Sequence, residues 1–270
     1  MAQGGFTHET PLLRPFYAME KITSRQNPRI AQLRLLAADR AARRAQGLYV
    51  CDGEKLLRDA LAAGITPVLV LWGAVPTLDL PSAVPQYLAP PSLLTYASPL
   101  VSSPGPLFAL PLPVPDEFTR PRRVLVLENM QDPGNVGTVI RTANALETDL
   151  VILTGASADP FGPKAARAAM GALLRQRVLE LPLAALGERL RTWDMPLWGA
   201  ALSKDARDVR GLDLRGAAVA VGNEGHGLSA ELLDLCTGQL IIPMAPESES
   251  LNAAVAAAIL MWVTFSVTFS

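Results

Sequence analysis

Three polar segments hold most of the side chains in this sequence that are able to do chemistry. Each follows an apolar run, and they span residues 132–145, 222–229 and 242–252. The first contains the amide of Asn135 and the guanidinium of Arg141, groups that donate hydrogen bonds to polar or anionic ligands. Taken singly, each segment also has a purely structural explanation, because glycine suits a tight turn and asparagine or serine suits the first position of a helix.

The elements around these segments predict an α/β domain. Apolar runs typical of strands lie at 124–128, 149–154, 176–181, 196–202, 217–222 and 239–243. Helical patterns lie at 134–147, 163–173, 183–192, 228–235 and 251–268. Because continuous apolar strands are typical of a parallel sheet covered on both faces, we expect that arrangement. Ligands of such sheets bind beyond the carboxyl ends of the strands, where the three polar segments fall.

The chain before residue 122 has a different character. Residues 28–72 alternate between helical and strand-like patterns. Twelve prolines then stand between Trp72 and Arg122, and they predict short strands without helices. We therefore expect four parts, namely an irregular leader at 1–18, a small α/β domain at 19–115, a linker at 116–121 and a larger α/β domain at 122–270.

Charge is distributed unevenly along the chain. The net charge of the 270 residues is −1, which does not suit a general polyanion binder. Between Lys21 and Val50, however, there are seven Lys or Arg and one acid. Such a stretch predicts either a nucleic-acid-binding face or an ordinary solvated helix face.

Cysteine and histidine are scarce. The two cysteines lie far apart, which suits a reducing compartment, and with two histidines they form no metal-binding pattern. We therefore expect a cytoplasmic protein without a metal. The apolar C-terminal run at 251–270 is rich in Ala, Thr and Ser and has no basic flank, which favours a buried helix over a membrane span.

The three polar segments also form a recognisable series. They read DPGNVGTVIRTANA, VGNEGHGLS, and IPM followed by ESLNAAVAAAI. In this order they closely resemble the three signature motifs of the SpoU (TrmH-like) RNA methyltransferases of the SPOUT superfamily. The resemblance covers residues 122–268. Residues 24–65 resemble the RNA-substrate-binding domain often fused in front, whose fold is like that of certain RNA-binding ribosomal proteins.

The resemblance implies a fold and an activity that periodicity does not reveal. The C-terminal segment is expected to thread through a loop and form a trefoil knot, an exception to the usual topology. The family binds S-adenosylmethionine, acts as a homodimer and transfers a methyl group to a ribose 2′-hydroxyl. The fused domain favours structured ribosomal RNA as substrate, with tRNA as the alternative.

The resemblance also carries residues over. The family's polar catalytic positions correspond to Asn135, Arg141, Glu224, Ser250 and Asn252. The cofactor positions correspond to Leu202, Gly222, Ile242 and Leu251. Arg141 would stabilise the developing alkoxide or, as has been discussed for the family, act as a general base. RNA contacts are expected from Arg25, Arg29, Arg43, Arg44, Lys164 and Arg167.

Several alternatives remain at this point. Glu224 is either part of the site or a structural carboxylate, and Lys164 and Arg167 either meet phosphate or lie on an ordinary helix surface. Gly225 and Gly227 belong to a near-match to a dinucleotide-binding fingerprint, but its late position in the chain argues against a nicotinamide-binding domain. A non-catalytic RNA-binding protein that keeps the fold, or a base methyltransferase, is also considered.

Overall fold

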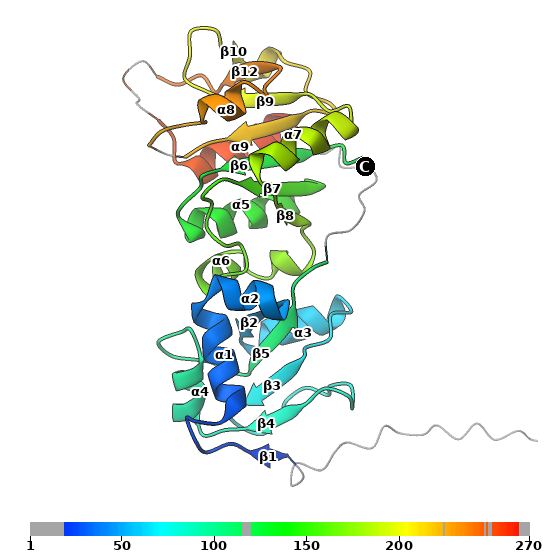
Figure 1. Ribbon diagram of the computed structural model, residues 1–270, viewed down its shortest axis with the longest axis vertical. Coiled ribbons are helices and arrows are strands. Elements are labelled where there is room, and N and C mark those ends of the chain that lie inside the picture. The colour runs from blue at the N-terminus through cyan, green and yellow to red at the C-terminus, as the bar shows by residue number, and fades with distance from the viewer. Residues whose placement is uncertain (1–18, 115–119, 224, 246, 248–249, 265–270) are drawn as a thin grey trace, which may run out of the picture.

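The chain folds around two separate sheets (Figure 1). The computed structural model describes residues 19–114, 120–223, 225–245, 247 and 250–264. We call residues 19–114 the N-terminal unit and residues 120–264 the C-terminal unit; they are stacked along the long axis of the molecule. The predicted leader and much of the predicted linker lie outside the described residues.

The N-terminal unit is built on a mixed five-stranded sheet of order β1-β4-β3-β5-β2. Its strands are β1 (Glu20–Lys21), β2 (Leu48–Asp52), β3 (Leu69–Trp72), β4 (Gln86–Leu88) and β5 (Leu107–Pro111). Its helices are α1 (Pro28–Ala38), α2 (Arg40–Gln46), α3 (Glu54–Ala62) and α4 (Pro91–Ala97). The side chains of Asn27 and Asp39 accept hydrogen bonds from the first turns of α1 and α2, so local sequence fixes where both helices begin.

Helix α4 contradicts the prediction that the proline-rich region contains no helix. Pro90 is its N-cap residue and Pro91 is its first residue. Proline is tolerated there because the first N–H groups of a helix have no partner within it, and the fixed φ of proline suits the helix. The number of prolines therefore misled the prediction, because their position at the helix start decides the outcome.

The C-terminal unit contains a seven-stranded sheet of order β10-β12-β9-β11-β6-β7-β8, in which every pairing is parallel. The strands are β6 (Val124–Glu128), β7 (Leu150–Thr154), β8 (Val178–Glu180), β9 (Leu197–Ala200), β10 (Arg207–Asp208), β11 (Ala218–Val221) and β12 (Gly238–Ile241). The expected parallel α/β architecture is thus confirmed for this part of the chain.

Helices cover both faces of this sheet. Helices α5 (Pro133–Ala145), α6 (Pro163–Ala168) and α9 (Ala253–Thr264) pack in one hydrophobic cluster, and α7 (Leu183–Thr192) and α8 (Ala230–Leu233) pack in another. The predicted helix at 163–173 is shorter, because Met170 and Gly171 have positive φ and break it. Among the described residues, no helix has the length and apolar character needed to cross a bilayer.

Candidate functional site

Three predicted cofactor residues lie at one edge of the parallel sheet. Leu202 follows β9, Gly222 follows β11 and Ile242 follows β12. These strands are neighbours and run parallel, so their carboxyl ends meet at the same edge, with about 4.8 Å between adjacent strands. Leu202 is 64% exposed, an unusual state for a leucine beside a sheet edge, and Ile242 is half-buried. The edge therefore offers apolar side chains on either side of the buried Gly222.

Gly222 is required by the geometry of the loop that follows it. The loop after it is a tight hairpin in which Asn223 and Gly227 exchange backbone hydrogen bonds of 3.0 and 2.9 Å. A Cβ atom on Gly222 would lie 2.2 Å from the backbone of Gly227. Glycine at this position therefore leaves space for the loop's own backbone.

The first and third polar segments meet at the starts of α5 and α9. The Nδ2 of Asn252 donates a hydrogen bond to Oδ1 of Asn135, with a distance of 3.3 Å. Asn252 also caps α9, because its Oδ1 accepts from the backbone N–H groups of Ala254 and Val255. Two amides separated by 117 residues in sequence are therefore brought into contact at helix N-termini.

Helices α5 and α9 are capped by residues other than Asn135 and Ser250, the asparagine and serine that suited that position in sequence. Asp132 caps α5, since its Oδ1 accepts from the N–H of Asn135 at 2.9 Å. At α9 the cap is Asn252, whereas Ser250 lies two residues upstream and is exposed. The side chain of Asn135 is thus not used as a cap, and it faces the third segment.

The remaining predicted catalytic residues are less closely placed. Arg141 is exposed on α5, about 9 Å farther along the helix axis than Asn135. Leu251 is half-buried beside Asn252. Glu224 lies outside the described residues. The structure thus joins Asn135 to Asn252 and leaves the roles of Arg141 and Glu224 as predictions.

Sequence reasoning missed a buried carboxylate that fixes the second polar segment. Glu128, at the end of β6, is 3% exposed. Its two oxygens accept hydrogen bonds from the backbone N–H of Ser229 at 2.7 Å and from its hydroxyl at 2.6 Å. An acid that ends the otherwise apolar run VLVLE was the available signal, because a buried carboxylate needs partners.

Arginines of the N-terminal unit are held over tyrosine rings. The guanidinium carbons of Arg25 and Arg34 lie 4.4 and 3.9 Å from the centre of the Tyr96 ring. Arg29 lies 5.9 Å from the ring centre of Tyr87. Stacking of this kind orders an exposed guanidinium and leaves its charge available to a ligand.

Two of these aromatic and basic residues line a cleft between the units. The cleft has a volume of about 570 Å³ and is bounded by Arg34 and Tyr96 on one side and by Lys164 and Arg167 of α6 on the other. Lys164 pairs with Asp132 at 3.0 Å. The hydrogen bond from Lys164, followed by the one from the Asn135 N–H, holds the pKa of Asp132 below its usual range. The cleft thus adjoins the helix that carries Asn135.

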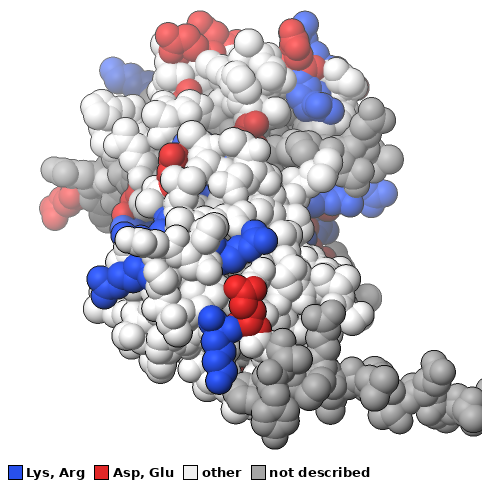
Figure 2. All heavy atoms as spheres, turned by 60° about the horizontal axis from the view of Figure 1, so that its bottom comes forward, with Lys and Arg blue, Asp and Glu red and all other residues white. Residues whose placement is uncertain are grey.

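The structure contradicts one predicted RNA-binding arginine, Arg43, and places a second, Arg44, in ion pairs. Arg43 is 4% exposed, and its guanidinium pairs with Asp159 at 2.7 Å. Arg44 is partly exposed and pairs with both Asp159 and Glu180. Arg43 is therefore unavailable to a phosphate, whereas Arg44 is held in ion pairs at a partly exposed position. Figure 2 shows the end of the molecule formed by the N-terminal unit, where basic residues are scattered between broad uncharged areas.

Comparisons with known proteins agree with this geometry. Residues 122–262 match the SpoU rRNA Methylase family. The chain is 35% identical over 258 residues to an uncharacterized tRNA/rRNA methyltransferase of Synechocystis, a match that covers 89% of this chain and 92% of the relative. It is 30% identical over 247 residues to the 23S rRNA (guanosine(2553)-2′-O)-methyltransferase RlmP of Bacillus subtilis, with 90% and 98% covered.

A solved structure is also similar over nearly the whole chain. The SpoU methyltransferase AviRb of Streptomyces viridochromogenes, in complex with the cofactor AdoMet, superimposes with a TM-score of 0.78 at 25% identity. The match covers 89% of this chain and 97% of that one. Since the family match extends over more than half of the sequence and both sequence relatives align along nearly their full length, the chain belongs to the SpoU rRNA methylase family.

Proposed function

We propose that this protein is an S-adenosylmethionine-dependent RNA methyltransferase that modifies a ribose 2′-hydroxyl of large-subunit ribosomal RNA. The observation that carries the proposal is the contact between Asn135, in the helix after β6, and Asn252, at the start of α9. It joins the first and third family motifs, and the hydrogen bond from Asn223 to the carbonyl of Asn129 joins the second motif to the end of β6. The substrate is inferred from the relative RlmP, whose name specifies 23S rRNA and the 2′-O position.

The residues at the sheet edge suit the cofactor. Leu202, Ile242 and Leu251 offer apolar side chains to an adenine ring, and the loop that follows Gly222 offers backbone hydrogen-bonding groups. We assign the cofactor to these residues. When bound, it supplies an electrophilic methyl group on a sulfonium.

Methyl transfer would replace the carbon–sulfur bond of the sulfonium with an oxygen–carbon bond at the ribose, and the 2′-hydroxyl proton would pass to solvent. We assign Arg141 to the ribose and its adjacent phosphate, where a guanidinium stabilises the negative charge that develops on the oxygen. Asn135 and Asn252 are assigned to the substrate, because their amides lie in contact and present polar groups at one place. Ser250 adds a hydroxyl at the same helix start, and Glu224 is assigned to the second loop.

The cleft between the units provides the RNA path in this proposal. Arg34, Lys164 and Arg167 present cations along this cleft, and Tyr96 holds the guanidinium of Arg34 in place. Arg25 and Arg29 extend the basic surface beyond the cleft. This combination suits the phosphates of an RNA chain.

Family membership supports four further parts of the proposal. These are the trefoil knot, the RNA-binding character of the N-terminal unit with the domain limits 19–115 and 122–270, a homodimer, and a cytoplasmic location.

A dimer is supported by the apolar helix α9, on which Val255 and Trp262 remain 48% and 59% exposed. Replacing Val255 with Asp should yield monomers by light scattering, whereas a dimer that persists would exclude this face.

The catalytic assignment is tested with labelled S-adenosylmethionine and 23S rRNA transcribed in vitro. The wild-type protein should transfer label, and Arg141→Ala should abolish transfer while calorimetry still detects cofactor binding. Arg58→Ala is the matched control, because Arg58 is an exposed arginine that pairs only within α3. Loss of cofactor binding in Arg141→Ala would show that Arg141 has another role. A parallel reaction with tRNA tests the alternative substrate, which label on tRNA and none on 23S rRNA would identify.

The cofactor assignment has its own test. Leu202→Asp places a charge on an exposed apolar position, so the fold should persist while cofactor affinity falls at least tenfold, since about 1.4 kcal/mol corresponds to that factor. Val75→Asp, at a position 61% exposed in the N-terminal unit, is the control. Unchanged affinity in Leu202→Asp would remove this residue from the cofactor site.

A further inference from the structure

The two units are joined by an apolar contact that lies beneath charged side chains. The rings of Tyr49, on β2, and Phe161, just before α6, have their centres 5.3 Å apart, and both residues are buried. Both also belong to one hydrophobic cluster that continues from the N-terminal unit into the C-terminal unit. The junction is therefore packed like a protein interior, which restricts motion between the units.

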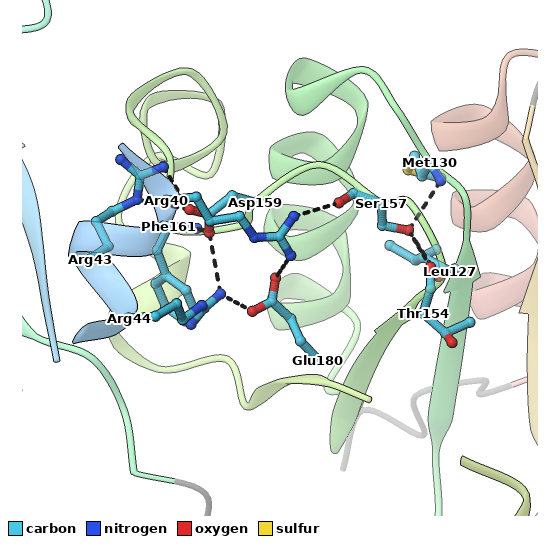
Figure 3. Close-up of polar contacts among 10 residues, drawn as sticks. All are labelled: Arg40, Arg43, Arg44, Leu127, Met130, Thr154, Ser157, Asp159, Phe161 and Glu180. Atoms are coloured by element: carbon cyan, nitrogen blue, oxygen red, sulfur yellow. Dashed lines mark hydrogen bonds and ion pairs between the residues drawn. The ribbon is translucent and has the colours of Figure 1, made fainter. Parts of the chain in front are cut away.

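Above this contact lies an ion-pair cluster, defined as Arg40, Arg43 and Arg44 of α2 with Asp159 and Glu180 of the C-terminal unit (Figure 3). Its centre is the pair of Arg43 and Asp159, whose side chains are 5% and 8% exposed. Arg43 also donates to the carbonyl of Leu36 at 2.6 Å. A buried charge with all of its partners in place tolerates little displacement, because separation leaves it without solvation.

The outer part of the cluster uses Glu180 as a second anchor. Its carboxylate pairs with Arg40 at 2.5 Å and with Arg44, so two arginines of one helix turn hold one acid at the end of β8. Arg44 also reaches Asp159 at 3.4 Å. The orientation of α2 relative to the parallel sheet is thus set by contacts from three arginines to two carboxylates.

The ion-pair cluster continues into the segment that precedes α5. Arg40 donates to the carbonyl of Ser157 at 3.2 Å, and the Ser157 hydroxyl accepts from the backbone N–H of Met130 at 3.1 Å. Met130 lies two residues before Asp132, the cap of the helix that presents Asn135. Figure 3 shows these residues in one row from α2 to the end of β6. An arginine of the first unit therefore supports the loop of the first catalytic motif.

We infer that the ion-pair cluster is a positioning device for methyl transfer, which holds the RNA bound by the N-terminal unit at a fixed distance from the α5 loop. The inference rests on the proposed function, since it assigns the cluster a role in that reaction. The cleft depends on the same geometry, because Arg34 and Tyr96 belong to one unit and Lys164 and Arg167 to the other. Asp159 and Glu180 are accordingly positioning residues that do not touch the substrate.

The experiment compares Glu180→Gln with the wild type in methyl transfer to 23S rRNA transcribed in vitro. Glu180 lies at the partly exposed side of the cluster, so the variant should fold and bind S-adenosylmethionine normally. We expect kcat to fall about tenfold, as misalignment of reacting groups does, while the Kd for RNA changes less than about twofold. Methyl groups should also appear on nucleotides next to the wild-type position.

Further variants separate positioning from stability. Asp159→Asn leaves Arg43 buried without an anion and should show the same loss of kcat and of site selection, with lower stability. Glu180→Asp retains the charge and should recover part of kcat. Asp213→Asn is the control, because Asp213 pairs with Arg215 two residues away on the surface.

The outcomes distinguish the inference from the proposed function. A wild-type protein that transfers no methyl group to RNA contradicts the proposed function. An active wild type whose Glu180→Gln and Asp159→Asn variants keep its kcat and its methylated nucleotide contradicts the positioning role alone. If the activity of the variants falls only in proportion to their fraction of folded protein, the positioning role is also contradicted.

Discussion

Helices α1 and α2 follow each other in the N-terminal unit and carry arginines in opposite surroundings. On α1, Arg29 and Arg34 are exposed and lie over tyrosine rings. On α2, Arg43 and Arg44 pair with carboxylates of the other unit. Among the described residues, no carboxylate lies within ion-pair distance of Arg34. One basic stretch thus divides into exposed, stacked arginines, to which we assign RNA binding, and a structural contact between the units.

The largest expected effect separates the two helices by stability. Arg43→Ala removes the buried partner of Asp159 and two hydrogen bonds to the end of α1. We expect the free energy of unfolding to fall by about 3 kcal/mol, as when one member of a buried pair is removed. Urea denaturation measures it, with Arg34→Ala as the matched arginine of α1. Equal stability loss in the two variants would remove the distinction.

The next effect separates the helices by RNA binding. Arg34→Ala should weaken RNA binding about tenfold and lower the slope of log K against log salt by about one, because one cation has left the interface. Its unfolding free energy should change by less than about 0.5 kcal/mol, as for a surface substitution. Titration of labelled RNA at several salt concentrations gives the slope, and an unchanged slope would exclude Arg34 from the cleft's RNA contacts.

Lys164 is intermediate, since it lines the cleft and pairs with Asp132. Asp132→Ala removes the cap of α5 and should cost about 1 kcal/mol of unfolding free energy. Asp132→Asn keeps a capping oxygen, so it should lower the unfolding free energy by less than Asp132→Ala does. It also removes the ion pair with Lys164, so it should tighten RNA binding. Chemical denaturation measures the unfolding free energy, and RNA titration measures the affinity. If Asp132→Asn lost as much unfolding free energy as Asp132→Ala, the charge of Asp132, and not its cap, would stabilise α5.

The same carboxylate predicts a pH effect. The pKa of Asp132 is lowered in the folded state, chiefly by Lys164. The carboxylate therefore contributes stability above its unfolded pKa, and that contribution is lost as the pH falls through the lowered folded value. Wild type and Asp132→Asn should differ in stability near neutral pH and converge in acid. A difference that persists unchanged at low pH would contradict this assignment.

The smallest effect is expected at Arg44, whose side chain is 37% exposed. Arg44→Ala should lower the free energy of unfolding by about 0.5–1 kcal/mol, because partly solvated ion pairs contribute little. In thermal melts, the difference in Tm between the variant and the wild type should be smaller in high salt than in low salt. A loss as large as that of Arg43→Ala would place Arg44 among the buried contacts.

Much of the fold follows from local patterns in the sequence. The strands of the C-terminal unit are continuous apolar runs, because both faces of the parallel sheet are covered. The capping residues Asn27 and Asp39 are also local signals. Helix α4 was missed because a count of prolines hides that Pro90 and Pro91 stand at the helix start.

The site was predictable only in part, because its contacts are distant in sequence. The motif order identified Asn135 and Asn252, but their contact joins residues 117 positions apart. Asp159, which lies 116 residues after Arg43, decides that this arginine is buried. No pattern within the basic stretch distinguishes Arg43 from Arg34, since the difference lies in what packs against each helix.

The central claim is that the methyl group is placed on a ribose 2′-oxygen, and alkaline hydrolysis of the labelled 23S rRNA tests it most directly. A methylated 2′-oxygen cannot attack the adjacent phosphate, so the bond next to it resists alkali. The account predicts that the label transferred by the wild-type protein is recovered in one alkali-stable dinucleotide and is absent with Arg141→Ala. Label recovered in single nucleotides would place the methyl group on a base and contradict the account.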